Sequence, residues 1–283
     1  MSKRLLILGH TGKMGLALSR ALAKDYSIVG KNSRDFDAGD FAQVRGIIEQ
    51  DKWDIVVNAV ALLGIDQCEQ QPQKALLLNT LYPRFLAELS KEKDFLLVHF
   101  STDAVFNDSK GDFYLEGDTP CPLNIYGLTK YGGDCFIQAI CRRYYIFRIP
   151  LLFGETTKSN QFVEKMLNKV RQGAGLIRVS SDIVTSPTYS LDVAWEIKRI
   201  IDRELPWGLY HLANAGKASL YELMVEIISG LGLEVKVEKA SYHDFAYIGI
   251  KNTFTPLASE KIDVLRPWKE AVKDYCAQIK FGL

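Results

Sequence analysis

The stretch FLLVHFSTDAVF (95–106) decides the fold of this 283-residue chain. Five of its first six residues are apolar, the composition of a strand that is buried on both faces of a parallel sheet. It ends in Ser101, Thr102 and Asp103, small polar side chains at the edge where α/β proteins bind ligands. The sequence therefore predicts a central buried strand that leads directly into a site.

Strand and helix patterns alternate on both sides of this stretch. Buried-strand patterns occupy residues 4–9, 26–30, 53–61, 95–100 and 144–154. Amphipathic helical patterns occupy residues 16–25, 41–52, 73–93 and 122–136, and residues 66–72 are expected to form a polar loop. Because single helices separate the strands, right-handed βαβ units follow. We expect an α/β fold, a Rossmann-type doubly wound parallel sheet.

The pattern is less regular after Gly154. Helices are predicted over 161–173, 190–203 and 219–232, and strands over 176–180, 208–214 and 234–240. We expect residues 1–154 to form a dinucleotide-binding Rossmann domain, with return elements from about 176–214. Residues 155–283 would then form mainly a smaller C-terminal α/β domain that binds the substrate.

The composition narrows the class of protein. With 47% hydrophobic and 24% charged residues and a net charge of +1, nothing calls for a nucleic acid or a membrane surface as partner. The five cysteines contain no CxxC pair, and no apolar run suits a signal peptide or a membrane span. The four histidines lack metal-ligand spacing, and His99 lies within the core strand as an expected neutral histidine. We expect a cytoplasmic protein without a metal.

A glycine-rich turn, GHTGKMG (9–15), follows the first predicted strand and leads into a helix. Its glycines Gly9, Gly12 and Gly15 have the spacing GxxGxxG, a variant of the GxGxxG dinucleotide fingerprint. Glycines here permit a tight turn and a close backbone approach, so that helix N–H groups can bind a pyrophosphate. The turn predicts a dinucleotide site; a merely tight connection is the alternative.

Tyr126 and Lys130 lie four residues apart in the predicted helix 122–136. At this spacing the phenol and the ammonium share one helix face, and the ammonium is expected to lower the phenol pKa from about 10. The phenol can then exchange a proton with a carbonyl or alcohol oxygen, and Thr102 can hydrogen-bond that same oxygen. These three residues are the predicted catalytic set; an ordinary surface Tyr–Lys pair is the alternative.

The same spacing occurs again at Tyr247 and Lys251. That segment, YIGIKNTF (247–254), contains a glycine, and no hydroxyl-bearing strand end precedes it. We interpret the second pair as a product of chance.

Four motifs carry a resemblance to a known family: GHTGKMG, NAVA (58–61), STDAVF (101–106) and YGLTK (126–130). In this order and at these distances they resemble the extended short-chain dehydrogenase/reductase family, and within it the dTDP-4-dehydrorhamnose reductases. Those proteins carry a GDF-type pair, a TKxxGE segment and a C-terminal RPW. The corresponding residues here are Asp40-Phe41, Gly133-Asp134 and Arg266-Pro267-Trp268. The similarity covers nearly the whole chain.

The resemblance implies an NAD(P)H-dependent oxidoreductase that reduces a nucleotide-linked 4-keto-6-deoxy sugar in deoxysugar and polysaccharide precursor biosynthesis, as in the dTDP-rhamnose route. It implies that Tyr126 protonates the 4-keto oxygen, that Lys130 holds the nicotinamide ribose, and that Thr102 orients the carbonyl. The implied substrate-binding residues are Thr102, Asp103 and Leu151. With the glycine turn, the cofactor-binding residues are Gly9, Thr11, Gly12, Lys13, Met14, Gly15, Asp40, Phe41, Asn58, Ala59, Val60, Ala61, Phe100, Tyr126 and Lys130.

Two segments on the substrate side depart from the family pattern. The family's RTSWVY strand end is replaced by RIPLLF (148–153), which puts Leu151 where an aromatic residue would pack on the sugar or base. A DQxGxPT loop appears as DIVTSPT (182–188), without the glutamine. The nucleotide-sugar class is expected, and the particular nucleotide and sugar are left open.

Two other functions are consistent with these motifs. A nucleotide-sugar epimerase or dehydratase is one, although dehydratases need added acid–base residues and Asp103-Ala104 offers a single carboxylate. The other is a non-catalytic regulatory protein, similar to the β subunit of methionine adenosyltransferase. A complete set of Thr102, Tyr126 and Lys130 argues against such a scaffold. A homodimer is compatible with the sequence, which does not specify the oligomeric state.

The connector after the second strand bears on the choice of cofactor. No acidic residue stands at its start, where one would select NAD. Lys31 and Arg34 instead supply cations suited to the 2′-phosphate of NADPH. We expect NADPH as the cofactor. NADH is the alternative, because Asp35 or Asp37 could turn inward.

Overall fold

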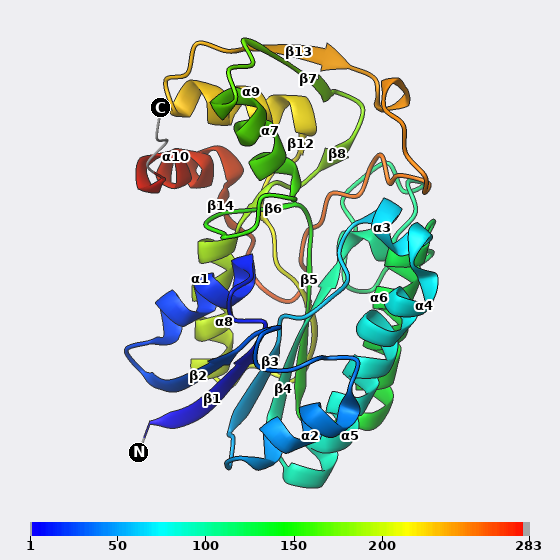
Figure 1. The fold of residues 1–283 in the computed structure, drawn as a ribbon, viewed down its shortest axis with the longest axis vertical. Helices are drawn as coiled ribbons and strands as arrows, with labels where there is room; N and C mark the ends of the chain where they lie inside the picture. Colours follow the sequence, from blue (N-terminus) through cyan, green and yellow to red (C-terminus); the bar gives the residue numbers. More distant parts are fainter. Residues whose placement is uncertain (1, 280–283) are drawn as a thin grey trace.

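The structure, a computed structural model, describes residues 2–279. At its centre is a six-stranded sheet in the order β10-β5-β4-β3-β1-β2, and every neighbouring pair is parallel (Figure 1). The strands are β1 (Lys3–Leu8), β2 (Tyr26–Lys31), β3 (Ile55–Asn58), β4 (Leu96–Thr102), β5 (Tyr144–Ile149) and β10 (Gly208–His211). The expected α/β fold with a doubly wound parallel sheet is confirmed.

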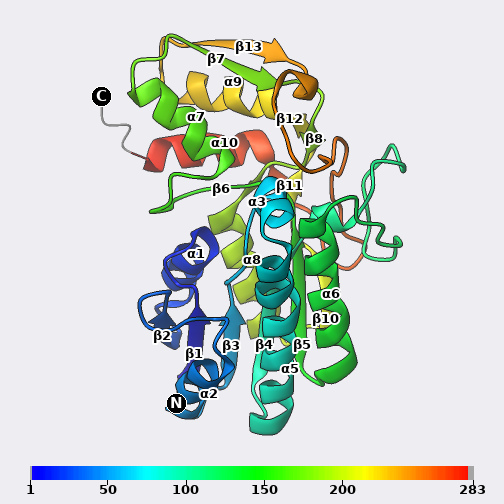
Figure 2. The ribbon, with the colours of Figure 1, turned by 45° about the vertical axis from the view of Figure 1, so that its right-hand side comes forward.

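Helices cover both faces of this sheet (Figure 2). One face packs against α1 (Lys13–Leu22) and α8 (Ser190–Asp202), and the other against α2 (Phe41–Glu49), α5 (Tyr82–Lys93) and α6 (Ile125–Ile140). Successive strand side chains point to opposite faces, so Leu5 and Ile7 join one apolar cluster while Leu6 and Leu8 join the other. This double burial explains the continuous apolar run of β1.

The order of the strands reverses between β1 and β3, because the chain leaves β1 toward β2 and then returns to the opposite side. Open α/β sheets bind ligands at such a reversal, beyond the carboxyl ends of the strands. The glycine turn follows β1 at this point, and Asn58 ends β3 beside it. The topology therefore brings two of the predicted cofactor segments together.

The segment between β3 and β4 is more helical than expected. The expected helix over 73–93 consists of α4 (Pro72–Leu76), a π-helical turn (Leu77–Leu81) and α5. The polar loop expected over 66–72 is wrong, because α3 (Ile65–Gln70) occupies most of it. Cys68 of α3 is fully buried in a small cluster with Leu62 and Ala75. Such tertiary packing stabilises a short helix that its polar composition does not predict.

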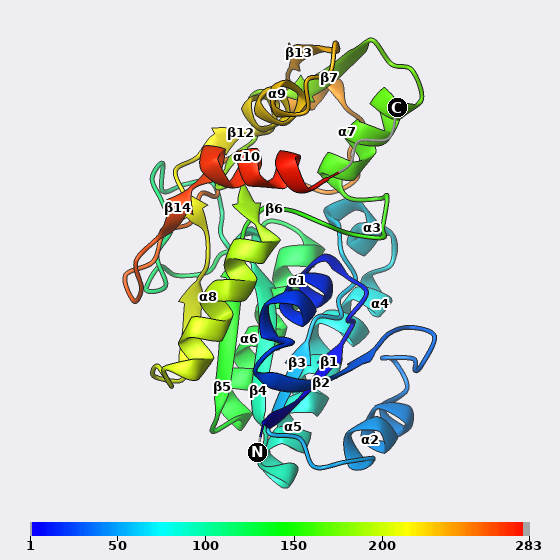
Figure 3. The same cartoon turned by 90° about the vertical axis from the view of Figure 1, so that its left-hand side faces the viewer.

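A second layer lies beyond the carboxyl ends of the sheet (Figure 3). It contains α7 (Phe162–Arg171), α9 (Leu220–Gly230), α10 (Trp268–Gln278) and the parallel pair β7 (Leu176–Ser180) and β13 (Lys236–Ala240). These elements share an apolar cluster of their own. Three short pairs complete the layer: β6 (Leu152–Phe153) with β9 (Thr188–Tyr189), β8 (Val184–Thr185) with β12 (Ala218–Ser219), and β11 (Asn214–Ala215) with β14 (Leu265–Pro267).

The part of the chain that returns to the main sheet is narrower than the expected 176–214. It consists of α8, which packs on α1, and β10, which pairs with β5. The strand β7 pairs with β13 in the second layer instead. Among residues 2–279, no helix is long and apolar enough to cross a membrane.

Candidate active site

Tyr126 and Lys130 lie on α6, and the start of this helix is fixed against the end of β4. Asn124 caps the helix by accepting a hydrogen bond from the Gly127 N–H at 2.8 Å. A Cβ atom on Gly127 would lie 2.0 Å from the carbonyl oxygen of Ala104. Glycine at this position therefore lets the first turn of α6 approach the segment after Thr102 closely.

The ammonium group of Lys130 is buried behind β4. Its side chain is 2% exposed, and Nζ donates to the carbonyl oxygen of Phe100 at 2.5 Å. Nζ also lies 3.2 Å from His99 Nε2. Burial lowers the pKa of Lys130 to about 8, against the opposing charge of Asp134. The lysine is thus held in place and titrates near the physiological range.

Tyr126 keeps its proton in this environment. Burial raises the pKa of the phenol, and a hydrogen bond with the Thr102 hydroxyl acts in the opposite direction but is outweighed. The expected lowering of the Tyr126 pKa by Lys130 is therefore not found, because desolvation dominates. A protonated phenol is the form that a general acid needs.

Asp103 and Leu151, two predicted substrate residues, face the second layer. Oδ1 of Asp103 accepts from the Thr102 hydroxyl at 3.1 Å, and Oδ2 accepts from Thr185 at 3.3 Å and Thr255 at 2.7 Å. Burial raises the pKa of this carboxyl group. Leu151 packs on the apolar cluster of the second layer, and its carbonyl accepts from the Thr188 N–H. Both side chains thus connect the end of the sheet to that layer.

The structural constraint that requires glycine differs among the three glycines of the turn. Gly9 has a φ of 89°, and a Cβ there would lie 2.8 Å from the Ala59 carbonyl oxygen. On Gly15 a Cβ would lie 2.5 Å from His10 Cα. On Gly12 it would meet the Gly9 oxygen at 3.3 Å and nothing closer. The fold itself explains Gly9 and Gly15, whereas close approach of a ligand is a fitting reason for Gly12.

The side chains of Lys13 and Met14 are buried in the protein interior. Nζ of Lys13 donates to the Leu152 carbonyl at 3.0 Å and forms an ion pair with Glu164 at 3.0 Å. Met14 is 6% exposed within the core cluster. Any contact of these residues with a cofactor would therefore come from their backbone N–H groups, at the start of α1.

Asp40 and Phe41 also have structural partners. Asp40 caps α2 by accepting from the N–H groups of Ala42 and Gln43 at 3.0 and 3.2 Å. Phe41 stacks on Phe85 with ring centroids 4.7 Å apart. Their predicted contact with the cofactor stays a prediction.

The basic and acidic side chains of the connector after β2 have different surroundings. The Lys31 carbonyl accepts from the Gly9 N–H at 2.7 Å, so Lys31 lies beside the glycine turn. Arg34 is exposed. Asp35 accepts from the Asn32 N–H at 2.7 Å, and Asp37 accepts from the Gly39 N–H at 2.8 Å. Both carboxylates are thus engaged by their local backbone.

The segment after β3 lies beside the same turn. The Ala59 N–H donates to the carbonyl of Leu8 at 2.8 Å, and the Val60 N–H donates to Asn58 Oδ1 at 3.1 Å. Thr11 and Ala61 are both partly exposed. The glycine turn and residues 58–61 therefore lie at the carboxyl end of β1, while the predicted catalytic set lies at the end of β4.

Sequence reasoning missed the polar partners behind Lys130. His99 was expected to be a buried neutral histidine; it is fully buried with a lowered pKa, but it also contacts Lys130. Two residues on, Ser101 donates to Asp134 at 2.8 Å, and Asp134 pairs with Arg148. The period of two along β4 puts His99 and Ser101 on the same face. That alternation was the available signal.

Among residues 2–279, no group of three or more His, Cys, Asp or Glu side chains could hold a metal ion. The site presents hydroxyl, phenol, amine and backbone groups beside the Asp103 carboxylate and the His99 imidazole. Such groups can transfer a proton to an oxygen and can bind a polar cofactor through hydrogen bonds.

Comparisons with known proteins identify relatives over nearly the whole chain. Residues 3–281 match the family described as the RmlD substrate binding domain. A spore coat polysaccharide biosynthesis protein, SpsK of Bacillus subtilis, is 31% identical, with 96% of each chain covered. The dTDP-4-dehydrorhamnose reductase of Mycolicibacterium smegmatis is 30% identical, with 99% of this chain and 86% of the relative covered.

A solved structure is similar in three dimensions as well. The dTDP-4-dehydrorhamnose reductase of Bacillus anthracis, in complex with NADP, superposes with a TM-score of 0.91 at 27% identity. The match covers 99% of this chain and all of that one. The expected resemblance is confirmed.

Proposed function

This chain belongs to the RmlD substrate-binding-domain family, and we propose that it is an NAD(P)H-dependent reductase of a nucleotide-linked 4-keto-6-deoxy sugar. One observation carries the proposal. Thr102, Tyr126 and Lys130 lie together at the carboxyl end of β4, with Lys130 buried against the Phe100 carbonyl and the Tyr126 phenol under the influence of the Thr102 hydroxyl. The relatives named dTDP-4-dehydrorhamnose reductase support the substrate class.

The residues divide the work of carbonyl reduction. The carbonyl carbon would receive its hydride from a bound nicotinamide. Tyr126, whose raised pKa keeps it protonated, donates its proton to the carbonyl oxygen as negative charge develops there. The Thr102 hydroxyl, which donates to Asp103 Oδ1 in this structure, would turn to donate a hydrogen bond to the same oxygen and would stabilise that charge. Lys130 would hold the nicotinamide ribose, and its ammonium form would place a positive charge near Tyr126.

The residues at the start of α1 fit a dinucleotide. The Gly12 Cα leaves room above the turn, and the first helical N–H groups carry the positive end of the helix dipole toward it. The first turn of α1 contains no acidic residue that would repel a pyrophosphate. Asn58 to Ala61 lie beside this turn and would support the cofactor from below.

We propose a separate binding role for each of the two layers. Residues 1–154, with α8 and β10, would bind the cofactor, and most of residues 155–283 would bind the sugar nucleotide. Five free cysteines and this substrate class support a cytoplasmic location.

The direct test is a screen of nucleotide 4-keto sugars for oxidation of NADPH, followed at the absorbance of the reduced nicotinamide. We expect turnover with a 4-keto-6-deoxy sugar nucleotide and none with the corresponding 4-hydroxy sugar. Binding of NADPH without any turnover, together with co-purification of another enzyme in equal amount, would instead support a regulatory role.

Cofactor choice gives a second test. Asp35 and Asp37 are engaged by local N–H groups, so Arg34 and Lys31 are the charges free to meet a 2′-phosphate. We expect kcat/KM to favour NADPH over NADH by about tenfold, because one exposed cation contributes roughly 1–2 kcal/mol. Arg34→Ala should narrow this ratio, and a clear NADH preference in the unmodified protein would contradict the assignment.

A further inference from the structure

A chain of three buried polar side chains runs behind the catalytic set. Asn58 of β3, His99 of β4 and Lys130 of α6 are 1%, 0% and 2% exposed. The amide nitrogen of Asn58 lies 3.0 Å from His99 Nδ1, and His99 Nε2 lies 3.2 Å from Lys130 Nζ. The imidazole therefore connects the end of β3 to the lysine.

Hydrogen-bond directions along this chain are fixed by the backbone. The Val60 N–H donates to Asn58 Oδ1, so the Asn58 amide presents its NH2 group to His99. His99 Nδ1 must then accept, and a neutral imidazole carries its proton on Nε2. That N–H points at Lys130 Nζ, which can accept it only as an amine, because an ammonium has no lone pair.

We propose that Asn58 and His99 are positioning residues that favour the uncharged amine of Lys130 in the free protein, so that binding of the cofactor adds a proton to this side chain. The coupling to cofactor rests on the proposed function, whereas the direction of the hydrogen bonds does not. An ammonium at Nζ would face the Nε2–H proton. Relief would require both a change of the His99 tautomer and a turn of the Asn58 amide, which would lose the Val60 hydrogen bond.

The other groups around Lys130 keep the equilibrium between its amine and ammonium forms near neutral pH. Asp134, one turn further along α6, favours the ammonium, but its carboxylate already pairs with Arg148 and Ser101. Cys68 of α3 has a pKa raised to about 11 by burial and is a neutral thiol. Tyr126 is a neutral phenol. With the pKa of Lys130 lowered to about 8, a polyanionic cofactor beside it would shift the balance toward the ammonium.

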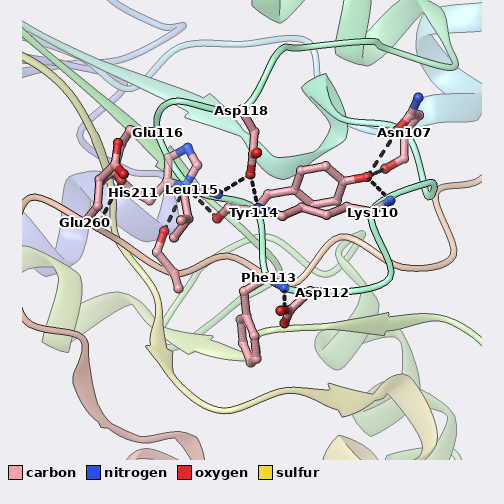
Figure 4. A network of polar contacts seen from close by, with 11 residues as sticks. Asn107, Lys110, Asp112, Phe113, Tyr114, Leu115, Glu116, Asp118, His211 and Glu260 are labelled. Carbon is pink, nitrogen blue, oxygen red and sulfur yellow. Dashed lines mark hydrogen bonds and ion pairs between the residues drawn. The ribbon is translucent and has the colours of Figure 1, made fainter.

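Nitrogen-15 NMR of ring-labelled histidine tests the first step on the free protein. The chain has four histidines, and two are buried in opposite arrangements. We expect His99 to carry its proton on Nε2 at pH 9. His211 should carry its proton on Nδ1, because Nδ1 lies 3.1 and 3.0 Å from the Tyr114 and Ala258 carbonyl oxygens. Figure 4 shows His211 beside Tyr114.

His211 thus serves as an internal control in the same spectrum. His99 signals should also shift with a midpoint near pH 8 that reports Lys130, and this shift should be absent in Lys130→Met. His211 should show no such midpoint. An Nδ1–H tautomer or an imidazolium at His99 at pH 9 would overturn the proposal.

Asn58→Asp should reverse the direction of the hydrogen bonds from residue 58 through His99 to Lys130, and the two side chains have nearly the same shape. A carboxylate can accept from the Val60 N–H but cannot donate to His99 Nδ1, so the imidazole proton should move to Nδ1. Nε2 then accepts from the ammonium, and the midpoint should rise by about one pH unit or more. If Asn58→Asp fails to fold, His99→Gln replaces it, because its amide oxygen can accept from the ammonium. This variant should also raise the Lys130 pKa, which is then read from a smaller proton uptake on NADPH binding.

Calorimetric titration with NADPH at pH 8, in two buffers of different ionisation enthalpy, tests the coupling. A group with a pKa near 8 is about half protonated at this pH, so uptake of roughly half a proton is expected. His99→Gln should take up less than half of that amount, and the exposed-histidine control His243→Gln should match the unmodified protein. Equal uptake in both variants would refute the coupling. A protein that binds no NADPH at all would refute the proposed function, and the NMR result would still stand.

Discussion

Two Tyr–Lys pairs with the same four-residue spacing occur in different environments in this protein. Tyr126 and Lys130 lie on α6, where Lys130 is buried against the Phe100 carbonyl and His99. Tyr247 and Lys251 lie in an irregular segment, where the ammonium sits 4.2 Å from the centroid of the Tyr247 ring. Lys251 also pairs with Asp66 of α3 at 3.2 Å. The same spacing thus gives a buried pair at the end of β4 in one place and a partly exposed pair that binds α3 in the other.

The two pairs have the same spacing but different properties. The burial and the polar contacts of each lysine therefore determine its pKa. At the first pair, desolvation lowers the lysine pKa to about 8 and leaves a backbone carbonyl as a fixed acceptor. At the second, Asp66 accepts from the N–H groups of Ile248 and Gly249 and stabilises the segment. The second pair therefore has structural partners, and its lack of a catalytic role stays an interpretation.

Removing each phenol gives the largest expected contrast. Tyr126→Phe removes the proposed proton donor and keeps the ring, so kcat should fall by ~10²–10⁴-fold with NADPH affinity nearly intact. Tyr247→Phe should change kcat by no more than about twofold, because surface substitutions seldom act on a distant site. Steady-state kinetics and cofactor titration measure both. Substantial activity in Tyr126→Phe would remove it from the catalytic set.

Asp134 and Asp66, the carboxylates that raise the pKa of Lys130 and Lys251 respectively, should matter unequally for stability. Asp134→Asn would leave the buried Arg148 without its carboxylate and should lower the free energy of unfolding by ~3 kcal/mol. Asp66→Asn keeps an acceptor for the two backbone N–H groups, and its partly exposed ion pair is screened by solvent. A loss of ~1 kcal/mol or less is expected there. Urea unfolding compares the two, and similar losses would contradict the contrast.

The pH dependence of stability separates the two lysines. Because the folded-state pKa of Lys130 is lowered, the unfolded chain binds more protons between about pH 8 and 10.5, and stability rises with pH in that window. Relative to Lys130→Met, the unmodified protein should gain ~1.4 kcal/mol per pH unit there. Lys251, which has a smaller shift in the same direction, should show a weaker slope against Lys251→Met. A flat difference for Lys130 would contradict its burial as a titrating group.

Local patterns in the sequence predicted the main sheet and the elements of the site. Apolar runs such as β1 and the glycine turn depend on nearest neighbours in the chain, so their type and order follow from composition and spacing. The helix α3 was missed because its stability comes from Cys68 packing against Leu62 and Ala75. The pairing of β7 with β13 was missed for the same reason, since strand partners distant in sequence leave no local pattern.

The sequence by itself determined that a hydroxyl, a phenol and an amine would meet at the end of a buried strand. It also determined that glycines would permit a tight turn and a close backbone approach after β1. Only the tertiary structure decided the protonation of these groups. Burial raised the pKa of Tyr126 and lowered that of Lys130, and the Val60 N–H fixed the direction of the Asn58–His99 chain. The physical reason is that desolvation and hydrogen-bond direction depend on atoms brought together from four separate elements, which no local spacing contains.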